Sequence, residues 1–188
     1  RYLRYCNKNE YLLENFKKYF ATLYPDAHFI EGKTNSGTLF VQVQNKEIIN
    51  YFLSICNDFR SESLEFPQSF NSYKSKKELI SAIFDDEGCV GLRVFRKTGD
   101  IKRNLEIASK SKKFLEDIKN ILEIDFDVKT NNLISFKRNL NGKEFITWKL
   151  SITGKENFEK FRDKIGFIHQ EKKEKLNVMI NSYIINKK

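Results

Sequence analysis

The sequence predicts an α+β protein made of two related halves, the first of which lacks its opening segment. The main evidence is an internal repeat: residues 1–20 align without a gap over residues 103–122, at an offset of 102 residues. In both copies, an alternating strand pattern changes into the pattern of an amphipathic helix. Each copy then continues as two strands joined by a turn, and a second helix. Strand pairs that alternate with helices in this way predict antiparallel sheets packed against helices.

In the first half, Asn7 is the expected cap of the first helix, which runs to Phe20. A turn at 35–37 joins the two strands that follow. The expected ranges of these two strands and of the second helix are 28–33, 38–44 and 46–56.

The second half carries an extra helix and hairpin in front of its copy of the repeat. Ser109 or Ser111 is the expected cap of the repeated helix, and Thr153 with Glu156 forms a capping box for the last helix. Asn141-Gly142 predicts a tight turn between the last two strands. The expected ranges are a helix at 77–88, strands at 89–97 and 101–109, a helix up to 122, strands at 133–139 and 145–152, and a helix at 154–165.

The repeat also predicts the domain organisation. Phe66-Pro67 and the polar stretch 68–76 are typical of a linker, so we expect an incomplete first half at 1–70 and a complete second half at 71–188. The counterpart of the extra helix is then expected upstream of Arg1.

The composition is that of a folded protein with an unusual charge. Of 188 residues, 40% are hydrophobic and 31% are charged, with 34 Lys and Arg against 25 Asp and Glu. Such a basic surface favours polyanions, most simply nucleic acid, although a lysine-rich protein without that role is the alternative. No apolar run is long enough for a membrane span. Cys6, Cys56 and Cys89 are isolated, which predicts buried free thiols in a reducing, cytoplasmic compartment.

The segment 79–90 is the most informative part of the chain. Residues with helical spacing predict one buried stripe: Leu79, Ile80, Ile83 and Phe84. Asp85, Asp86 and Glu87 follow in the last turn, where the helix dipole is already negative. Gly88 is expected to end the helix in the left-handed conformation.

Three carboxylates at this end of a helix are unfavourable unless a cation binds beside them. A divalent metal such as Mg²⁺ takes oxygen ligands and keeps waters for chemistry. The other interpretation is a buried helix followed by a glycine and solvated acids. The spacing alone does not decide between the two.

The strands of the second half predict a sheet with one face on the helices and one open face. Side chains expected to face the helices are Val90, Leu92, Val94, Leu105, Ile107, Ile146, Trp148, Leu150 and Ile152. Side chains expected on the open face or near its turns are Arg93, Phe95, Lys97, Lys102, Asn104, Glu106, Lys137, Arg138, Lys143, Thr147, Lys149 and Ser151. Such a face fits a DNA major groove, where Arg and Lys read guanine, Asn104 reads adenine and turn lysines hold phosphates. An ordinary solvated face is the alternative.

The nine residues from Ile80 to Gly88 resemble, position by position, the motif of the LAGLIDADG homing endonucleases, with Asp85 and Gly88 identical. Residues 150–176 are similar to the closing segment of these proteins. The resemblance covers nearly the whole chain. It implies two αββαββα halves with saddle-shaped antiparallel sheets, of which the first is truncated at its N-terminus.

The resemblance also implies roles for single residues. Glu87, at the last acidic position of the motif, is implied as metal ligand and catalytic carboxylate, with Gly88 beside it in the metal site. Lys172, or its neighbour Lys173, matches the supporting lysine of the family, which stabilises charge at the scissile phosphate or orients water. A solvated lysine run is the alternative for these two residues.

The small motif positions, Ser81 and Ala82, are implied to let two motif helices pack closely, and Asp85 is implied as a structural acid there. Asp86 departs from the family pattern, because it stands where a small residue is usual.

The implied activity is site-specific hydrolysis of phosphodiesters in double-stranded DNA with Mg²⁺ or Mn²⁺, using a carboxylate from each of two motif helices. Only one motif is present, and residues 61–67 of the first half offer no matching lysine. A non-cleaving binder on the same scaffold, either an RNA maturase or a transcription regulator, is therefore the main alternative. An unrelated basic interaction protein is the third. The lone motif helix also predicts a homodimer or a missing upstream partner helix, and no membrane partner is expected.

Overall fold

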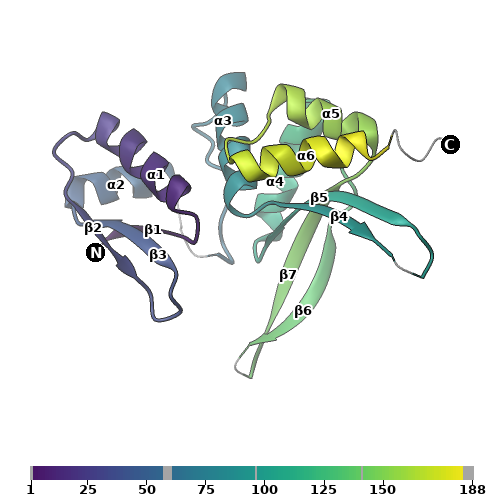
Figure 1. The fold of residues 1–188 in the computed structure, drawn as a ribbon. Coiled ribbons are helices and arrows are strands. Elements are labelled where there is room, and N and C mark those ends of the chain that lie inside the picture. The colour runs from purple at the N-terminus through teal and green to yellow at the C-terminus, as the bar shows by residue number, and fades with distance from the viewer. Residues whose placement is uncertain (1, 57–60, 96, 141, 184–188) are drawn as a thin grey trace. The chain divides into compact units, whose positions relative to one another are not determined.

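The computed structural model describes residues 2–56, 61–95, 97–140 and 142–183 of the chain (Figure 1). The chain divides into two compact units, Arg1–Ile55 and Cys56–Lys188. Within the described ranges, no helix is both long enough and apolar enough to cross a membrane.

The first unit is a three-stranded antiparallel sheet with helices on one face. Its elements are β1 (Leu3–Asn7), α1 (Glu10–Leu23), β2 (Phe29–Lys33), β3 (Leu39–Val43) and α2 (Lys46–Ile55). The central strand β3 pairs with both β1 and β2. Asn9, rather than the expected Asn7, caps α1, because its side chain accepts a hydrogen bond from the N–H of Tyr11. The buried centre of the small core is Phe20, Val43 and Ile48.

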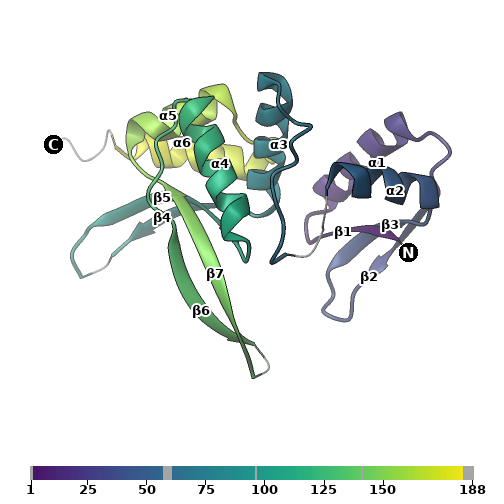
Figure 2. The ribbon, with the colours of Figure 1, turned by 180° about the vertical axis from the view of Figure 1, so that it is seen from behind.

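The second unit is a four-stranded antiparallel sheet whose helices gather on one side (Figures 1 and 2). Its elements are α3 (Tyr73–Asp86), β4 (Cys89–Val94), β5 (Ile101–Ser109), α4 (Lys112–Ile124), β6 (Ile134–Leu140), β7 (Lys143–Ile152), α5 (Lys155–Lys164) and α6 (Gln170–Asn181). The strand order is β4-β5-β7-β6. The β4–β5 and β6–β7 hairpins extend beyond the helices in different directions (Figure 1).

The internal repeat is visible in the topology. The order β1-β3-β2 of the first unit matches the order β5-β7-β6 of the second. Helix α1 begins at Glu10 and α4 at Lys112, which preserves the sequence offset. The second unit adds α3 and β4 before the shared part and α6 after it. The predicted α+β class and its antiparallel sheets are confirmed.

The main core lies between the sheet and the helices of the second unit. Helix α4 contributes one continuous stripe, which consists of Phe114, Leu115, Ile118 and Leu122. The strand residues that face the helices here are Leu105, Ile107, Leu150 and Ile152, as predicted, and each is at most 2% exposed. Burying a side chain of this size is worth about 1.5–3 kcal/mol relative to leaving it in water.

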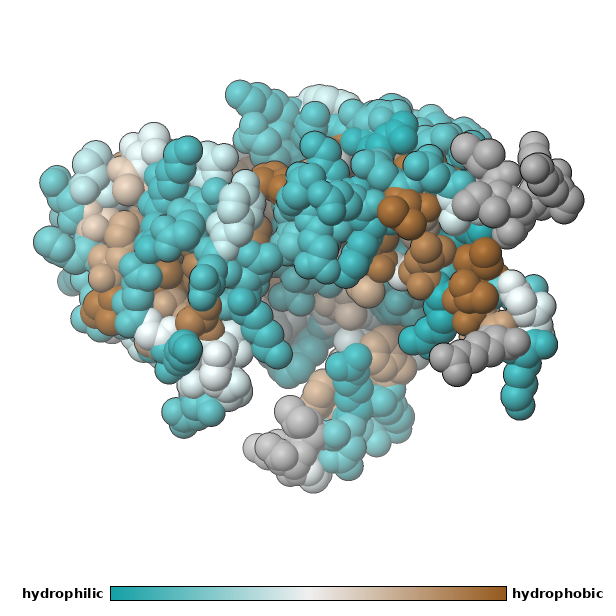
Figure 3. Space-filling view, viewed as in Figure 1, coloured by the Kyte–Doolittle hydropathy of each residue, from teal (hydrophilic) through white to brown (hydrophobic). Residues whose placement is uncertain are grey.

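The outer parts of the hairpins do not show the predicted burial. Leu92, Val94 and Ile146 are 40%, 59% and 50% exposed. These residues lie on the helix side of the sheet, but the hairpins extend past the helices there. In Figure 3, hydrophobic side chains gather over β4 and the adjoining part of α6, where Val178 is also exposed.

The division between the two units lies after Ile55 rather than after residue 70. Phe66 is a buried member of the core of the second unit. The hydroxyl of Ser111, which caps α4, donates a hydrogen bond to the carbonyl of Leu64 at 2.6 Å. The segment around Phe66-Pro67 is therefore a packed part of the second unit and not a linker.

Two predicted helix signals are wrong. Gly88 does not have a left-handed backbone; instead, a β-carbon there would lie 2.3 Å from the carbonyl oxygen of Phe84. Thr153 does not cap α5, because Gly154 occupies the N-cap position without a side-chain hydrogen bond. The Thr153 hydroxyl donates to the side-chain oxygen of Asn131 at 3.2 Å instead.

The cysteines are free thiols, as predicted, but their predicted burial is wrong. Cys6 and Cys89 are exposed, and Cys56 is partly exposed.

Candidate functional site

The end of α3 is tied to the start of α6 by a buried acid. The carboxylate of Asp85 accepts hydrogen bonds from the backbone N–H groups of Ile168 at 2.9 Å and His169 at 3.1 Å. Backbone N–H groups at a helix start lack partners within the helix and favour negative charge. Burial raises the pKa of Asp85, and the two N–H groups counteract that effect. Asp85 is therefore occupied in holding the two helices together.

Lys172, near the start of α6, contacts the same helix end. Its ammonium group donates to the carbonyl oxygens of Phe84 and Asp85. These carbonyls belong to the last turn of α3, where the helix leaves acceptors unpaired. Burial lowers the pKa of Lys172, and the charge of Asp85 opposes this shift. The neighbouring Lys173 is exposed.

The three predicted helix-interface residues point in different directions. The buried hydroxyl of Ser81 donates to the carbonyl of Gly166 at 3.0 Å, so Ser81 and Asp85 both contact the 166–169 segment of their own unit. Ala82 is exposed, between the half-buried Leu79 and Ile83. Of the three, Ala82 alone is open to a second helix.

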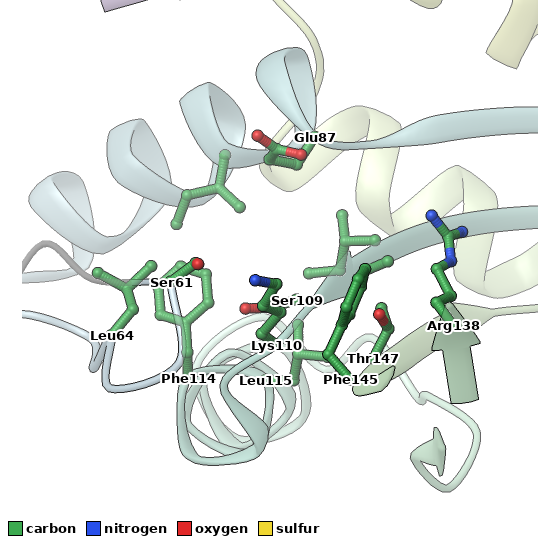
Figure 4. A pocket seen from close by; sticks show the side chains of 13 residues that line it. Ser61, Leu64, Glu87, Ser109, Lys110, Phe114, Leu115, Arg138, Phe145 and Thr147 are labelled. Atoms are coloured by element: carbon green, nitrogen blue, oxygen red, sulfur yellow. The ribbon is translucent and has the colours of Figure 1, made fainter. Parts of the chain in front are cut away.

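Glu87 is the exposed residue that follows α3, and it lines a cavity of about 370 Å³. Across the cavity from Glu87 lie Lys110 and Arg138 (Figure 4). The Lys110 ammonium lies 2.8 Å from the carboxylate of Glu62 and 4.7 Å from the centre of the Phe145 ring. A carboxylate and two cations therefore line the same cavity, and one of the cations, Lys110, is paired with Glu62.

The open face of the sheet carries most of the predicted polar residues. The strand register places these side chains on one face: Arg93, Lys102, Asn104, Glu106, Arg138, Thr147, Lys149 and Ser151. Phe95 and Lys97 are exposed in the turn after β4. Lys137 lies opposite Ile146 and so on the other face, where its ammonium group is 2.9 Å from Glu144. Lys143 begins β7, but its side chain lies outside the described residues.

Short polar residues form the base of this face. Asn104, Thr147 and Ser151 were expected to be exposed, yet each is only 7% exposed. Gly91 leaves the space that Asn104 fills, since a β-carbon at 91 would lie 2.3 Å from the Asn104 side-chain oxygen. These three residues are therefore buried within the open face.

The positive charge of the second unit is unevenly distributed. Many lysines on the helices are paired with acids one turn away: Lys112 with Glu116, Lys113 with Asp117, Lys119 with Glu123, Lys155 with Glu159, Lys160 with Glu156, and Lys175 with Glu171. On the open face, Lys149 is paired with Glu106 at 3.0 Å. Arg93, Lys102 and Arg138 are exposed and have no carboxylate partner among the described residues. The open face therefore carries positive charge that no carboxylate of the described residues neutralises.

Comparison with known families agrees with this arrangement. Residues 75–166 match the model of the LAGLIDADG-like domain. The chain contains a LAGLIDADG-like domain. The matched range runs from within α3 through α5, and so includes Glu87 and the open sheet face. A search of curated proteins found no match to the chain.

Solved structures of the homing endonuclease I-DmoI share the architecture. Its mesophilic variants are 16% identical with a TM-score of 0.61, over 87% of this chain and 74% of that chain. A variant of I-DmoI bound to its target DNA in the presence of Mg is 17% identical, with a TM-score of 0.60, over 87% and 79%. Another variant, with target DNA and Mn, is 17% identical with a TM-score of 0.61, over 89% and 80%. The chain therefore has the LAGLIDADG homing endonuclease fold.

The LAGLIDADG-like domain fits half of a divalent-metal site. Among the described residues, no three His, Cys, Asp or Glu side chains come together as a metal-binding group. Glu87 offers one carboxylate next to the cavity. Because Mg²⁺ in nucleotide-processing sites is commonly held by one or two carboxylates, waters and substrate phosphate, the donor set suits that ion but needs further oxygens.

Lys110 is a site residue of the LAGLIDADG-like domain that the sequence analysis missed. It directly follows β5 and does not belong to the motif. One signal was available, because Lys8 occupies the same position in the first copy of the repeat. A lysine that recurs directly after equivalent strands in both copies of the repeat is a candidate for a shared function.

Proposed function

We propose that this chain binds double-stranded DNA on the open faces of its sheets and cuts phosphodiester bonds with a divalent metal. The observation that carries the proposal is the cavity in which Glu87 faces Lys110 and Arg138, next to a sheet face with unpaired cations. The likeness to I-DmoI, solved with target DNA and Mg, Mn or Ca, supports it.

In this proposal, Glu87 and the backbone at Gly88 hold Mg²⁺ or Mn²⁺. When bound, the ion polarises a phosphate and lowers the pKa of a water. Arg138 neutralises the phosphate through a charge-assisted hydrogen bond, and Lys110 exchanges its partner Glu62 for the phosphate. Lys172 holds the end of α3, after which Glu87 follows. Lys173 is exposed to solvent and adds positive charge near the site.

A complete site needs a second carboxylate. In this proposal, a second motif helix packs against α3 at the exposed Ala82, between Leu79 and Ile83. We propose that this helix comes from a second copy of the chain, as a homodimer, or from a first motif in a longer chain. Sedimentation of the chain with and without DNA separates a dimer from a monomer.

The chemistry is tested by nicking of a supercoiled plasmid that carries sites selected by the chain from random DNA. With Mg²⁺, we expect nicking that EDTA abolishes and that Glu87→Gln reduces at least about 100-fold, because the metal loses its carboxylate. Glu78→Gln removes an exposed acid from the same helix and should nick normally. DNA binding should survive both changes. If Glu87→Gln nicks DNA at the normal rate, Glu87 is not part of the active site.

The second candidate is a non-cleaving binder, either an RNA maturase or a transcription regulator. It is favoured by the single carboxylate that the described residues bring to the cavity. Tight binding without nicking under any divalent metal supports this candidate, and competition by structured RNA or by duplex DNA identifies the partner. For either candidate we propose a reducing, cytoplasmic compartment, with which the free thiols agree.

A further inference from the structure

The open face of the first unit holds an arginine whose guanidinium group is bound along one of its edges. Arg4 on β1 lies opposite Gln42 on β3. Its Nε and Nη2 groups both donate to the Gln42 side-chain oxygen, at 2.9 and 2.6 Å. Gln42 is only 5% exposed, so burial restricts the movement of its side-chain oxygen, which is the acceptor. One edge of the guanidinium is therefore occupied within the protein.

Two aromatic rings fix the same guanidinium. Its central carbon lies 4.6 Å from the centre of the Tyr2 ring and 4.2 Å from the centre of the Phe40 ring. A free arginine side chain carries about 2 kcal/mol of rotamer entropy, which it loses when it binds. Stacking and the bond to Gln42 remove much of that freedom before any ligand arrives, and this prepares Arg4 for a specific contact.

The other edge of the guanidinium is available. Of the five N–H groups of an arginine, two go to Gln42, and the remaining three have no partner among the described residues. The Nη1 and Nη2 groups present two parallel donors along the available edge. Guanine places two acceptors, O6 and N7, side by side in the major groove, and arginine binds both.

We propose that Arg4 determines sequence specificity by reading a guanine in the major groove. The proposal rests on the proposed DNA binding and goes beyond it by naming the base. A phosphate contact does not require a side chain that is fixed in this way. The rest of this face carries no other charged side chain, since its strand residues are Cys6, Ile30, Gly32, Phe40 and Gln42.

The two units therefore present different chemistry. Glu106 occupies the repeat position of Arg4 in the second unit, and it is paired with Lys149. A carboxylate only accepts hydrogen bonds, so it cannot bind the two acceptors of guanine as an arginine does. The guanine contact of Arg4 should therefore fall in the part of the target that the first unit binds.

The test is selection of binding sites from a random duplex library by the full-length chain, followed by affinity measurements. We expect the wild type to require a guanine at one position, and Arg4→Ala to lose that requirement with about 10-fold weaker binding to the guanine site. Arg4→Met keeps the length of the side chain without its hydrogen-bond donors and should also lose the preference. Gln42→Leu should weaken the preference in part. Lys18→Ala, an exposed cation on α1, should change nothing.

Two results would overturn the inference while leaving DNA binding intact. One is equal weakening on all sequences by Arg4→Ala, which indicates a phosphate contact. The other is an unchanged base preference in Arg4→Met, the variant that decides the matter if Arg4→Ala does not fold. A wild-type chain that binds no duplex DNA overturns the proposed function and this inference together.

Discussion

At residue 88, the chain passes so close to its own backbone that only hydrogen fits in place of a side chain. The Phe84 carbonyl oxygen would lie 2.3 Å from a β-carbon there, and neighbouring backbone atoms would lie at 3.0 Å. The helix backbone cannot move without shifting Glu87, which follows α3 directly. Glycine at this position thus sets where the candidate catalytic carboxylate stands.

We expect Gly88→Ala to lower the free energy of unfolding by about 1–3 kcal/mol, the usual cost of forcing extra atoms into a packed site. Gly91→Ala is the matched control, because the atom in its way is the end of the Asn104 side chain, which can rotate. Urea denaturation followed by circular dichroism gives both values. Equal losses in the two variants would contradict this explanation.

Site residues in the contiguous motif could be predicted from the sequence, but residues assembled by folding could not. Glu87 stands in a segment whose spacing alone draws attention. Lys110 is brought to the same cavity by the path of β5, and its neighbour Arg138 by the pairing of β6 with β7. The burial of Asn104 and Thr147 arises in the folded unit, and an alternating pattern does not specify it.

Among the elements, the junction of α3 with α6 carries the clearest structural role. Asp85 accepts hydrogen bonds from two N–H groups at the start of α6. Just after the end of α6, Arg103 on β5 donates to the hydroxyl of Ser182 at 2.7 Å and to its carbonyl at 2.9 Å. Helix α6 is therefore held at both ends by side chains distant in sequence.

Asp85→Ala should lower the free energy of unfolding of the second unit by about 1–3 kcal/mol, since two partly buried N–H groups lose their charged acceptor. Asp100→Ala removes an exposed acid from the turn between β4 and β5 and should have little effect. Thermal unfolding of the two variants under the same conditions makes the comparison. A stable Asp85→Ala would mean that water replaces the carboxylate without cost.

The sequence predicted most elements but not all of their surroundings. Strand ranges agree closely, as for 101–109 and β5 (Ile101–Ser109), because alternation and turn residues are local signals. The exposure of Leu92 and Val94 depends on where the helices stop covering the hairpin, which is a property of the assembled unit. Likewise, Thr153 matched a capping box by type, but Asn131 from another segment took its hydroxyl.

For the molecule as a whole, the position of unpaired charge predicts how salt acts on binding. Replacing Arg93, Lys102 and Arg138 together by glutamine should make the slope of log K against log salt shallower by about 0.9 for each phosphate that the protein no longer neutralises. Replacing Lys112, Lys113 and Lys119 is the control, because these cations are already paired on α4. Titrations of duplex DNA at several salt concentrations provide the slopes. The same change in both triple variants would show that the open face is not the binding surface.

The ion pairs along α4, α5 and α6 also affect the second unit before it touches a ligand. They neutralise Lys112, Lys155 and Lys175 on the helices, whereas Arg93, Lys102 and Arg138 keep their charge on the open face. A polyanion attracts these three cations over about 8 Å at physiological salt. In the proposed DNA binding, this attraction favours approach to the open face and raises the association rate most at low ionic strength.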